Sequence, residues 1–277
     1  MGGVTVSIVL KDHATSASKP RNEDLFRHTS RQAMLLDGST NLGLYSNMPD
    51  ASWFVEEFSK AFFMEEPDTD TQPRLAAAID RAAEVCLKNT GIDPRTTNLT
   101  PSASLLLLEE KGDQLELFAL GDCSFVVYYR DGRPPERFRD NRVDAFDGRV
   151  LAAMEEMAAH TGMDILATVQ TEKIRTMLAE NRSKMNTPEG YWILAFSKEA
   201  LQHLRKWSLP KEGVSHVLLF SDGFDWMAED FLRQIPAEPL SVLCQKLRRM
   251  EEADRNCNRY PRFHTHDDAC AALLEIK

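Results

Sequence analysis

The chain has 277 residues, a formal net charge of −10 and 43% hydrophobic residues. This length suits one large domain or two small ones, and the composition is too apolar for a disordered protein. The acidic balance excludes nucleic acid as an expected partner, because a broad acidic face repels phosphate. No apolar run reaches the roughly 18 residues that cross a bilayer, so we expect no membrane partner.

The N-terminus and the cysteines indicate where the protein works. The apolar stretch at 5–10 is too short for a secretory signal, and no lysine or arginine precedes it. The five cysteines are odd in number and lack CxxC spacing, which is typical of reduced thiols. We therefore expect a cytoplasmic protein, without a disulfide framework, and a monomer.

The first third of the chain predicts two strands and two helices. The strands are expected at 5–9 and 32–36, and the helices at 51–63 and 72–90, where Gly91 is a suitable stop. Apolar residues near helical spacing predict a core-facing stripe on the first helix, formed by Trp53, Phe54, Phe58 and Phe62.

The rest of the chain alternates between groups of strands and groups of helices. Strands are expected at 103–110, 115–120, 125–130, 191–196, 214–220 and 269–276. Helices are expected at 149–181, in two pieces broken near Gly162, and then at 198–207 and 239–253. This grouping favours a single domain with an α+β layered fold and largely antiparallel sheets.

Carboxylates stand at the ends of several predicted strands. Asp37, Asp122 and Asp222 each follow an apolar run, Asp267 precedes the last strand, and Asp24 closes Arg21-Asn22-Glu23-Asp24. If these acids met at one rim, two of them 4 Å apart would repel by about 4 kcal/mol at an effective dielectric near 20. Such a cluster needs cations, and hard oxygen ligands select Mg²⁺ or Mn²⁺.

A simpler interpretation of each Asp-Gly pair is a turn, because this dipeptide is common in turns. It occurs four times, at Asp37, Asp131, Asp147 and Asp222. We expect the pairs at Asp131 and Asp147 to be turns only. The metal-site interpretation gains its weight from the ordered set of motifs.

That ordered set resembles the metal-dependent Ser/Thr protein phosphatases of type 2C, particularly their bacterial branch. The matching segments, in the family's order, are Asn22–Phe26, Asp37-Gly38, Ser102–Ser124, His216–Gly223 and His266–Ile276. The resemblance runs from about residue 5 to 276. It implies a four-layer αββα sandwich of two antiparallel sheets flanked by helices, as one domain over 1–277 with a family-variable helical or flap region at 149–210.

The resemblance also implies a site. The implied metal ligands are Asp24, Asp37, the Gly38 carbonyl, Asp122, Asp222 and Asp267. Asp37 would bridge two Mn²⁺ or Mg²⁺ ions, and Asp122 with Asp222 would form a weaker third site. The implied reaction is hydrolysis of phosphoserine or phosphothreonine on a phosphoprotein by a hydroxide that bridges the two ions, with Asp37 and Asp222 as the catalytic residues.

Several positions depart from the family pattern. Loop 37–43 has no histidine to act as general acid, and Cys123 replaces the usual serine after Gly-Asp. The phosphate-binding arginine position is Lys19, so Lys19 or the nearby Arg21 is expected to bind phosphate, although lysine lacks the bidentate fork. These departures leave open a second interpretation, a catalytically silent relative that acts as a binding or regulatory module.

One further motif suggests zinc. His264-Thr265-His266 with Asp268 is similar to the start of a zinc hydrolase motif, but Ala269 stands where the next histidine is needed. We expect these histidines to be surface loop residues rather than zinc ligands.

Overall fold

The computed structural model describes residues 7–40, 47–65, 69–97, 100–227, 232, 235 and 237–277. Ten strands in this part of the chain form two five-stranded sheets, and every pair of neighbouring strands is antiparallel. The first sheet has the order β1 (Ile8–Ser16), β10 (Ala269–Ile276), β9 (Val214–Phe220), β6 (Ser124–Tyr129) and β7 (Glu136–Arg139). The second has the order β2 (Asp24–His28), β3 (Gln32–Ser39), β4 (Ser102–Lys111), β5 (Gln114–Leu120) and β8 (Arg205–Pro210).

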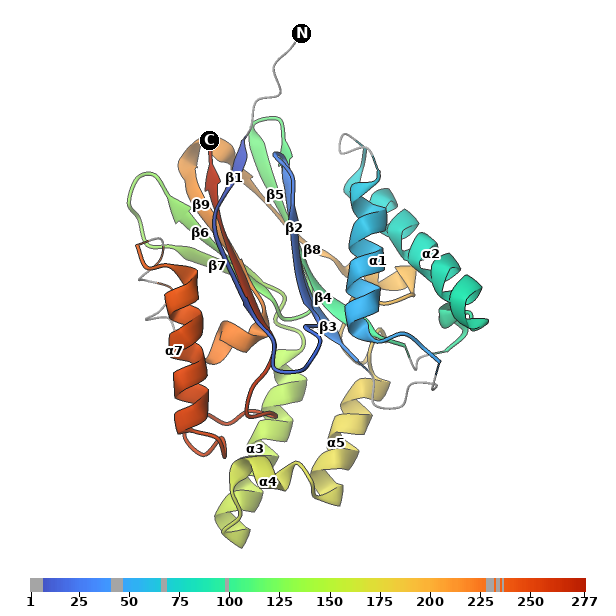
Figure 1. Ribbon diagram of the computed structural model, residues 1–277, viewed down its shortest axis with the longest axis vertical. Helices are drawn as coiled ribbons and strands as arrows, with labels where there is room; N and C mark the ends of the chain where they lie inside the picture. The colour runs from blue at the N-terminus through green and yellow to red at the C-terminus, as the bar shows by residue number, and fades with distance from the viewer. Residues whose placement is uncertain are drawn as a thin grey trace.

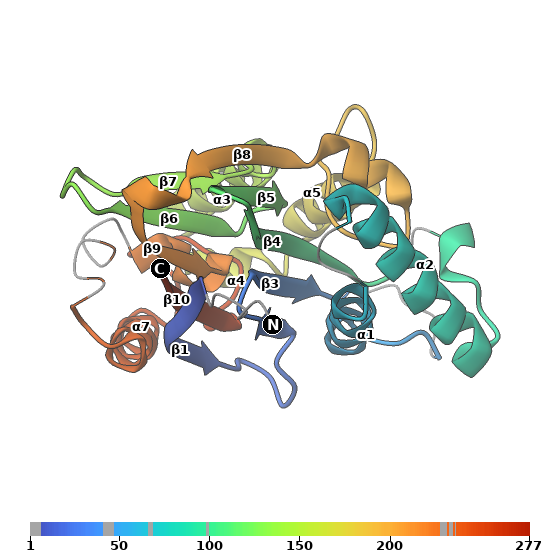
Figure 2. The ribbon, with the colours of Figure 1, turned by 90° about the horizontal axis from the view of Figure 1, so that it is seen from above.

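Helices flank the two sheets, which stand side by side in Figure 1. The α-helices are α1 (Ala51–Phe63), α2 (Thr71–Thr90), α3 (Asp144–Thr161), α4 (Ile165–Thr168), α5 (Glu172–Ser183) and α7 (Leu240–Ala253). Short 3₁₀ turns are η1 (Pro94–Thr96), η2 (Lys198–His203), η3 (Lys211–Gly213) and η4 (Asp222–Met227). Helices α1 and α2 lie outside the second sheet, α7 lies outside the first, and α3 to α5 extend from one end (Figures 1 and 2).

The central strand β4 shows why the layers pack in this order. Its run Leu105–Leu108 is fully buried, although alternate side chains of a strand point to opposite faces. Leu105 and Leu107 pack in the cluster formed with α1 and α2, and Leu106 and Leu108 pack against the other sheet. Covering both faces is worth about 1.5–3 kcal/mol for each buried leucine. The four-layer αββα sandwich is therefore confirmed.

The outer layers are amphipathic, as the periodicity predicts. Helix α1 begins and ends where we expected, and its Phe54, Phe58 and Phe62 are buried against the second sheet, with Trp53 partly buried. On the opposite side Leu243 of α7 packs in a cluster with residues of the first sheet. None of the helices in the described ranges is long and apolar enough to span a membrane.

Some predicted elements were wrong. The sequence did not predict β2, β7 and β8, and the first strand extends to Ser16, beyond the expected end at Val9. Residues 191–196 are not a strand, and only single bridges hold Tyr191 and Leu194. The helix expected at 198–207 is a 3₁₀ turn followed by β8. Short edge strands owe their extended form to a neighbouring strand, so their own sequence carries little signal.

The connection between β5 and β6 positions one predicted metal ligand. Their sequence pattern is typical of a hairpin, but the chain crosses there from the second sheet to the first. Gly121 makes this crossing with φ of +88°, and a Cβ at this position would lie 2.3 Å from the Ser104 hydroxyl oxygen. Asp122 and Cys123 consequently sit where the two sheets meet.

Candidate metal centre

The predicted acidic ligands meet at one end of the sandwich. Asp24 begins β2 and is paired in register with Asp37 near the end of β3. Asp122 stands on the crossing between the sheets, and Asp222 begins η4, with one residue, Ser221, between it and the end of β9. Each carboxylate is carried on backbone that a strand ladder or a sharp crossing holds in place.

Asp267 is brought to the same place by the pairing of β9 with β10. The Ser221 N–H donates to the Cys270 carbonyl, at 3.0 Å, which holds the end of β9 against the start of β10. Gly223 allows the close approach, because a Cβ there would lie 2.1 Å from the Asp268 carbonyl oxygen. Asp222 and Asp267 thus enter the cluster from neighbouring strands.

Burial and mutual repulsion perturb these acids. Burial raises the pKa of Asp37 well above its ordinary value, and the charges of Asp24, Asp122 and Asp267 raise it further. Burial likewise raises the pKa of Asp222, with added repulsion from Asp37, Asp122 and Asp267. The pKa of Asp267 is raised by burial as well. Carboxylates gathered this closely favour a bound cation.

The hydrogen bonds of Asp24 also indicate that a cation is needed. It is 8% exposed, and burial, opposed by the Ser221 hydrogen bond, raises its pKa to about 8. The Ser221 hydroxyl donates to Oδ2 at 2.7 Å, whereas Oδ1 is buried without a hydrogen-bond partner. A buried, unpaired carboxylate oxygen costs free energy unless something else binds it. The donor set therefore fits hard divalent cations.

Protein cations do not neutralise the cluster. Among the described residues, no lysine or arginine forms an ion pair with Asp24, Asp37, Asp122, Asp222 or Asp267. Arg137 and Arg139, on the neighbouring strand β7, pair with Asp225 instead. Lys19 pairs with Glu23. The charges of His264 and Lys19 act on Asp267, but most of the negative charge of the cluster is left for ions from solution.

Gly38 brings the backbone of β3 close to the cluster. Its N–H donates to the Glu23 carbonyl at 3.1 Å, and a Cβ on residue 38 would lie 2.6 Å from that same oxygen. Only glycine fits this approach without a shift of the chain. The carbonyl predicted as a ligand is thus carried by a segment that packs directly beside Asp24.

The two predicted phosphate-binding residues lie in different surroundings. The Lys19 ammonium donates to Glu23 Oε2 at 2.7 Å and lies close enough to Asp267 and Asp268 for their charges to raise its pKa. Its side chain is 55% exposed. Arg21 is more exposed and pairs with Asp50, 3.4 Å away at the start of α1. Lys19 therefore borders the acid cluster, while Arg21 extends toward the first helix.

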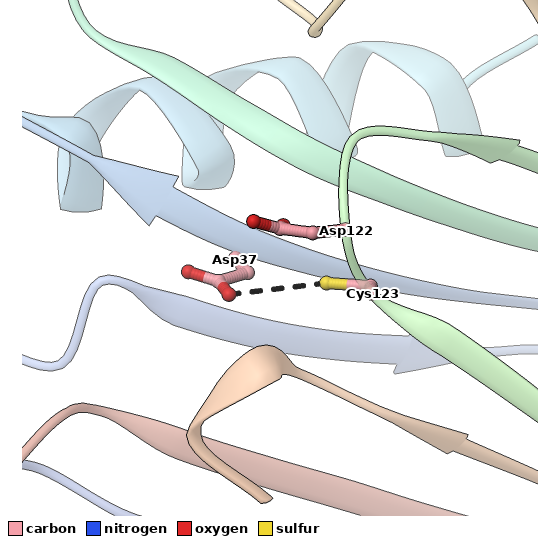
Figure 3. Close-up of side chains that lie close together, drawn as sticks. All are labelled: Asp37, Asp122 and Cys123. Carbon is pink, nitrogen blue, oxygen red and sulfur yellow. Dashed lines mark hydrogen bonds between the residues drawn. The ribbon is translucent and has the colours of Figure 1, made fainter. Parts of the chain in front are cut away.

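A thiol stands among the acids, and our sequence interpretation assigned it no ligand role. The Cys123 thiol donates to Asp37 Oδ2 across 3.9 Å, and the Asp122 side chain lies above both in Figure 3. One ligand atom of each of these three residues lies within 4.8 Å of the others. Ser104 also contributes, because its hydroxyl donates to Asp122 Oδ1 at 2.6 Å. In the sequence, only the Gly-Asp-Cys motif could have indicated that Cys123 lies among these acids.

Asp147 is a second residue that the sequence interpretation missed. We expected Asp147-Gly148 to be a turn, but both residues lie within α3, whereas Asp131-Gly132 is indeed a turn. Burial raises the pKa of Asp147 to about 7, with repulsion from Asp122 as the next cause. The helical segment thus places a further acid within electrostatic reach of the centre.

Two residues of the zinc-like motif, His266 and Asp268, bond to other side chains and backbone groups. His266 contacts Glu251 at 2.8 Å through Nδ1. Asp268 accepts hydrogen bonds from both the N–H and the hydroxyl of Ser18 and from the Glu23 N–H. Asp268 thus braces the loop before β2, whereas His266 joins its own loop to α7.

Comparisons with known proteins agree with this architecture. Neither a protein-family model nor a curated protein matches the chain. Among solved structures, the Ser/Thr phosphatase PstP/Ppp of Mycobacterium tuberculosis matches with a TM-score of 0.57 and 16% identity, over 98% of this chain and 99% of that one. The catalytic domain of PstP in complex with two manganese ions matches at 0.51 and 18%, over 98% and 99%.

Stp1, a Ser/Thr phosphatase from Staphylococcus aureus, matches with a TM-score of 0.52 and 14% identity, over 97% of this chain and 96% of that one. Identities this low establish the fold alone. The chain therefore has the fold of the type 2C Ser/Thr phosphatases over nearly its whole length, as the motifs predicted.

Proposed function

We propose that the chain is a metal-dependent protein phosphatase that hydrolyses phosphoserine or phosphothreonine. The observation that carries the proposal is the cluster of five carboxylates at the meeting edge of the two sheets, with the buried oxygen of Asp24 unpartnered. An acid cluster of this kind destabilises the metal-free fold, so its presence is best explained by function. The solved structures of similar fold are named Ser/Thr phosphatases, which supports this substrate class.

The proposed ligands of two or three Mn²⁺ or Mg²⁺ ions are Asp24, Asp37, the Gly38 carbonyl, Asp122, Asp222 and Asp267. When bound, such ions would activate water as the nucleophile and stabilise charge on the phosphoryl oxygens. Asp37 lies between other members of the cluster, because it is paired in register with Asp24 and its carboxylate lies within 4.8 Å of an Asp122 oxygen. That position fits the bridging role, and Asp222 from the other sheet fits the second catalytic role.

Lys19 is the group we assign to phosphate binding first. Its exposed ammonium borders Asp267 and is held by Glu23, so it faces the edge of the centre with donors to spare. Arg21 is held by Asp50 and stays a prediction in this role. Cytoplasmic location and a monomeric state likewise stay predictions from the sequence.

The decisive experiment measures release of inorganic phosphate from a phosphothreonine peptide. We expect turnover with Mn²⁺ or Mg²⁺, its loss in EDTA, and its recovery on adding Mn²⁺. Asp222→Asn is expected to lower kcat by about 1000-fold or more, the scale at which single electrostatic groups act. Asp131→Asn is the matched control, because this acid lies 66% exposed in a turn and should leave kcat unchanged.

The alternative of a silent binding module predicts a different pattern. The phosphopeptide would then bind in the presence of metal, measured by calorimetry, with no release of phosphate under any metal condition. Wild-type activity in Asp222→Asn would contradict the ligand assignment itself.

A further inference from the structure

The thiol of Cys123 does not match the rest of the centre. The other candidate ligands are oxygens, which prefer hard ions, whereas a thiolate prefers softer ones such as Zn²⁺ or Cd²⁺. Cys123 is only 1% exposed, and its sulfur faces the Asp37 carboxylate (Figure 3). Its backbone is fixed, because the next residue, Ser124, is paired with Phe220 of β9. The thiol is therefore held against the acids.

The distances fit one shared ion. Zinc binds sulfur at about 2.3 Å and oxygen at about 2.1 Å, so tetrahedral ligand atoms lie about 3.4–3.6 Å apart. The Cys123 sulfur and Asp37 Oδ2 are 3.9 Å apart, and an Asp122 oxygen lies within 4.8 Å of both. Closing the set to these distances requires a shift of the Asp122 carboxylate, which accepts a hydrogen bond from the Ser104 hydroxyl at 2.6 Å.

A second observation points to a ligand independently of the thiol. Asp24 is paired with Asp37 across β2 and β3, and its Oδ1 is buried without a hydrogen-bond partner. Its charge also reaches Cys123. Three close donor atoms, with an unsatisfied buried oxygen on the residue paired with Asp37, give the coordination capacity that a cation requires.

A purely packing role explains less of this arrangement. Cys123 does contribute to the cluster between the sheets, together with residues such as Phe125 and Leu219. A side chain that only fills space in a hydrophobic core needs no carboxylate neighbour. The Cys123 sulfur nevertheless lies at the edge of this hydrophobic cluster, in contact with Asp37. All five cysteines are free, so no disulfide occupies this thiol.

We propose that Cys123, Asp37 and Asp122 form a binding site for a thiophilic divalent cation, of which Zn²⁺ is the natural representative, and that this site overlaps the one for the activating ion. Binding breaks the S–H bond, releases the proton to solvent and forms a metal–sulfur bond, with no change of oxidation state. Because Asp37 belongs to both sites, Zn²⁺ excludes the activating ion. The competition rests on the proposed function, whereas the binding site does not.

Optical titration of the whole chain tests the binding site directly. Co²⁺ or Cd²⁺ is added to metal-free protein, and sulfur-to-metal charge-transfer absorption is followed in the ultraviolet. We expect a band that saturates at one ion per chain in wild type and is lost in Cys123→Ser. Cys257→Ser is the matched control and should keep the band, because this thiol bonds to the backbone carbonyls of Arg255 and His264, which a serine also reaches.

Competition is measured as the Zn²⁺ concentration that halves Mn²⁺-supported phosphate release. This concentration should rise at least about tenfold in Cys123→Ser, equivalent to losing about 1.4 kcal/mol of zinc affinity. If the variant does not fold, X-ray absorption of zinc-loaded wild type decides, because a sulfur ligand gives a shell at about 2.3 Å.

The outcomes separate the two proposals. A phosphatase without the charge-transfer band overturns the thiol site and leaves the proposed function intact. A band in a protein that never releases phosphate supports the thiol site and overturns the function. A band that persists in Cys123→Ser assigns the ion to another cysteine and overturns this inference.

Discussion

The sandwich and the helical segment α3–α5 both place acids near the candidate centre, but they hold them differently. In the sandwich, Asp24 and Asp37 stand on paired strands covered by layers on both sides. The helical segment packs mainly on itself, around Val150, Met154, Ile165 and Ile174. Its end is tied to the sheet by Arg182, which donates to the hydroxyls of Ser39 and Ser102 at 3.4 and 3.1 Å.

The two regions differ in how far their acids can move. An acid on a strand ladder cannot move away from its neighbours, so it stays repelled until a cation binds. Asp147 on α3 is carried by an element that hydrogen bonds join to the sheet, and each such bond is worth about 1 kcal/mol. We therefore expect changes to the strand-borne acids to affect the proposed metal site more than changes to the helical segment.

The largest expected effect is on the sandwich side. Asp37→Asn removes the central acid, and we expect kcat to fall by about 1000-fold or more, as for other single electrostatic groups. The metal-free variant should nevertheless melt at a higher temperature than wild type, because the repulsion is relieved. Phosphate release and thermal unfolding in EDTA measure the two effects. A variant with lower activity but an unchanged melting temperature would contradict the repulsion.

Burial of Asp24, with repulsion from Asp222 and Asp268 added to it, makes the stability of the metal-free protein depend on pH. The folded-state pKa of Asp24 is raised from 3.8 to about 8, so between these values the folded state holds more protons than the unfolded state. Stability is therefore expected to fall as pH rises from 5 to 8. Thermal unfolding in EDTA measures the fall, and saturating Mn²⁺ should remove or reverse it. A metal-free melting temperature that increases over this range would show that the acids are not repelling.

A glycine comparison tests backbone packing in the two regions. Gly38→Ala forces a Cβ to within 2.6 Å of the Glu23 carbonyl oxygen and should cost about 1–3 kcal/mol, as overpacking does. Gly148→Ala in α3 meets no atom within 4 Å and should stabilise by about 0.5–1 kcal/mol through helix propensity. Urea unfolding measures the change in unfolding free energy for each variant. If both variants were stabilised, or both destabilised, the expected difference in packing between the two positions would be wrong.

The smallest effect is expected where the segment joins the sheet. Arg182→Gln loses hydrogen bonds to Ser39 and Ser102 and should lower amide-exchange protection in α5 by about 1 kcal/mol. Strand β4 should keep its protection. Arg175→Gln is the matched control, since this exposed arginine contacts Gln170 within the segment. Loss of protection throughout β4 would show that the segment is part of the rigid core.

Much of the fold was readable from local pattern. Helix α1 was predicted with its observed bounds, α2 to within one residue, and β9 and β10 at their observed positions. Long amphipathic or fully apolar segments carry their own signal. The order of the acidic motifs, read beside a family resemblance, also indicated which carboxylates gather.

Other features were decided only by the tertiary structure. The sequence by itself determined most helices and long strands of a layered α+β fold and the order of the acidic residues, because periodicity and residue chemistry are local; the family resemblance added the four-layer arrangement. The crossing at Gly121, the edge strands β7 and β8, and the approach of Asp147 to Asp122 depend on chain segments far apart in sequence. So does the meeting of the Cys123 thiol with Asp37, since Asp37 lies on β3 and Cys123 lies on the crossing from β5 to β6, and no local pattern records a contact between these segments.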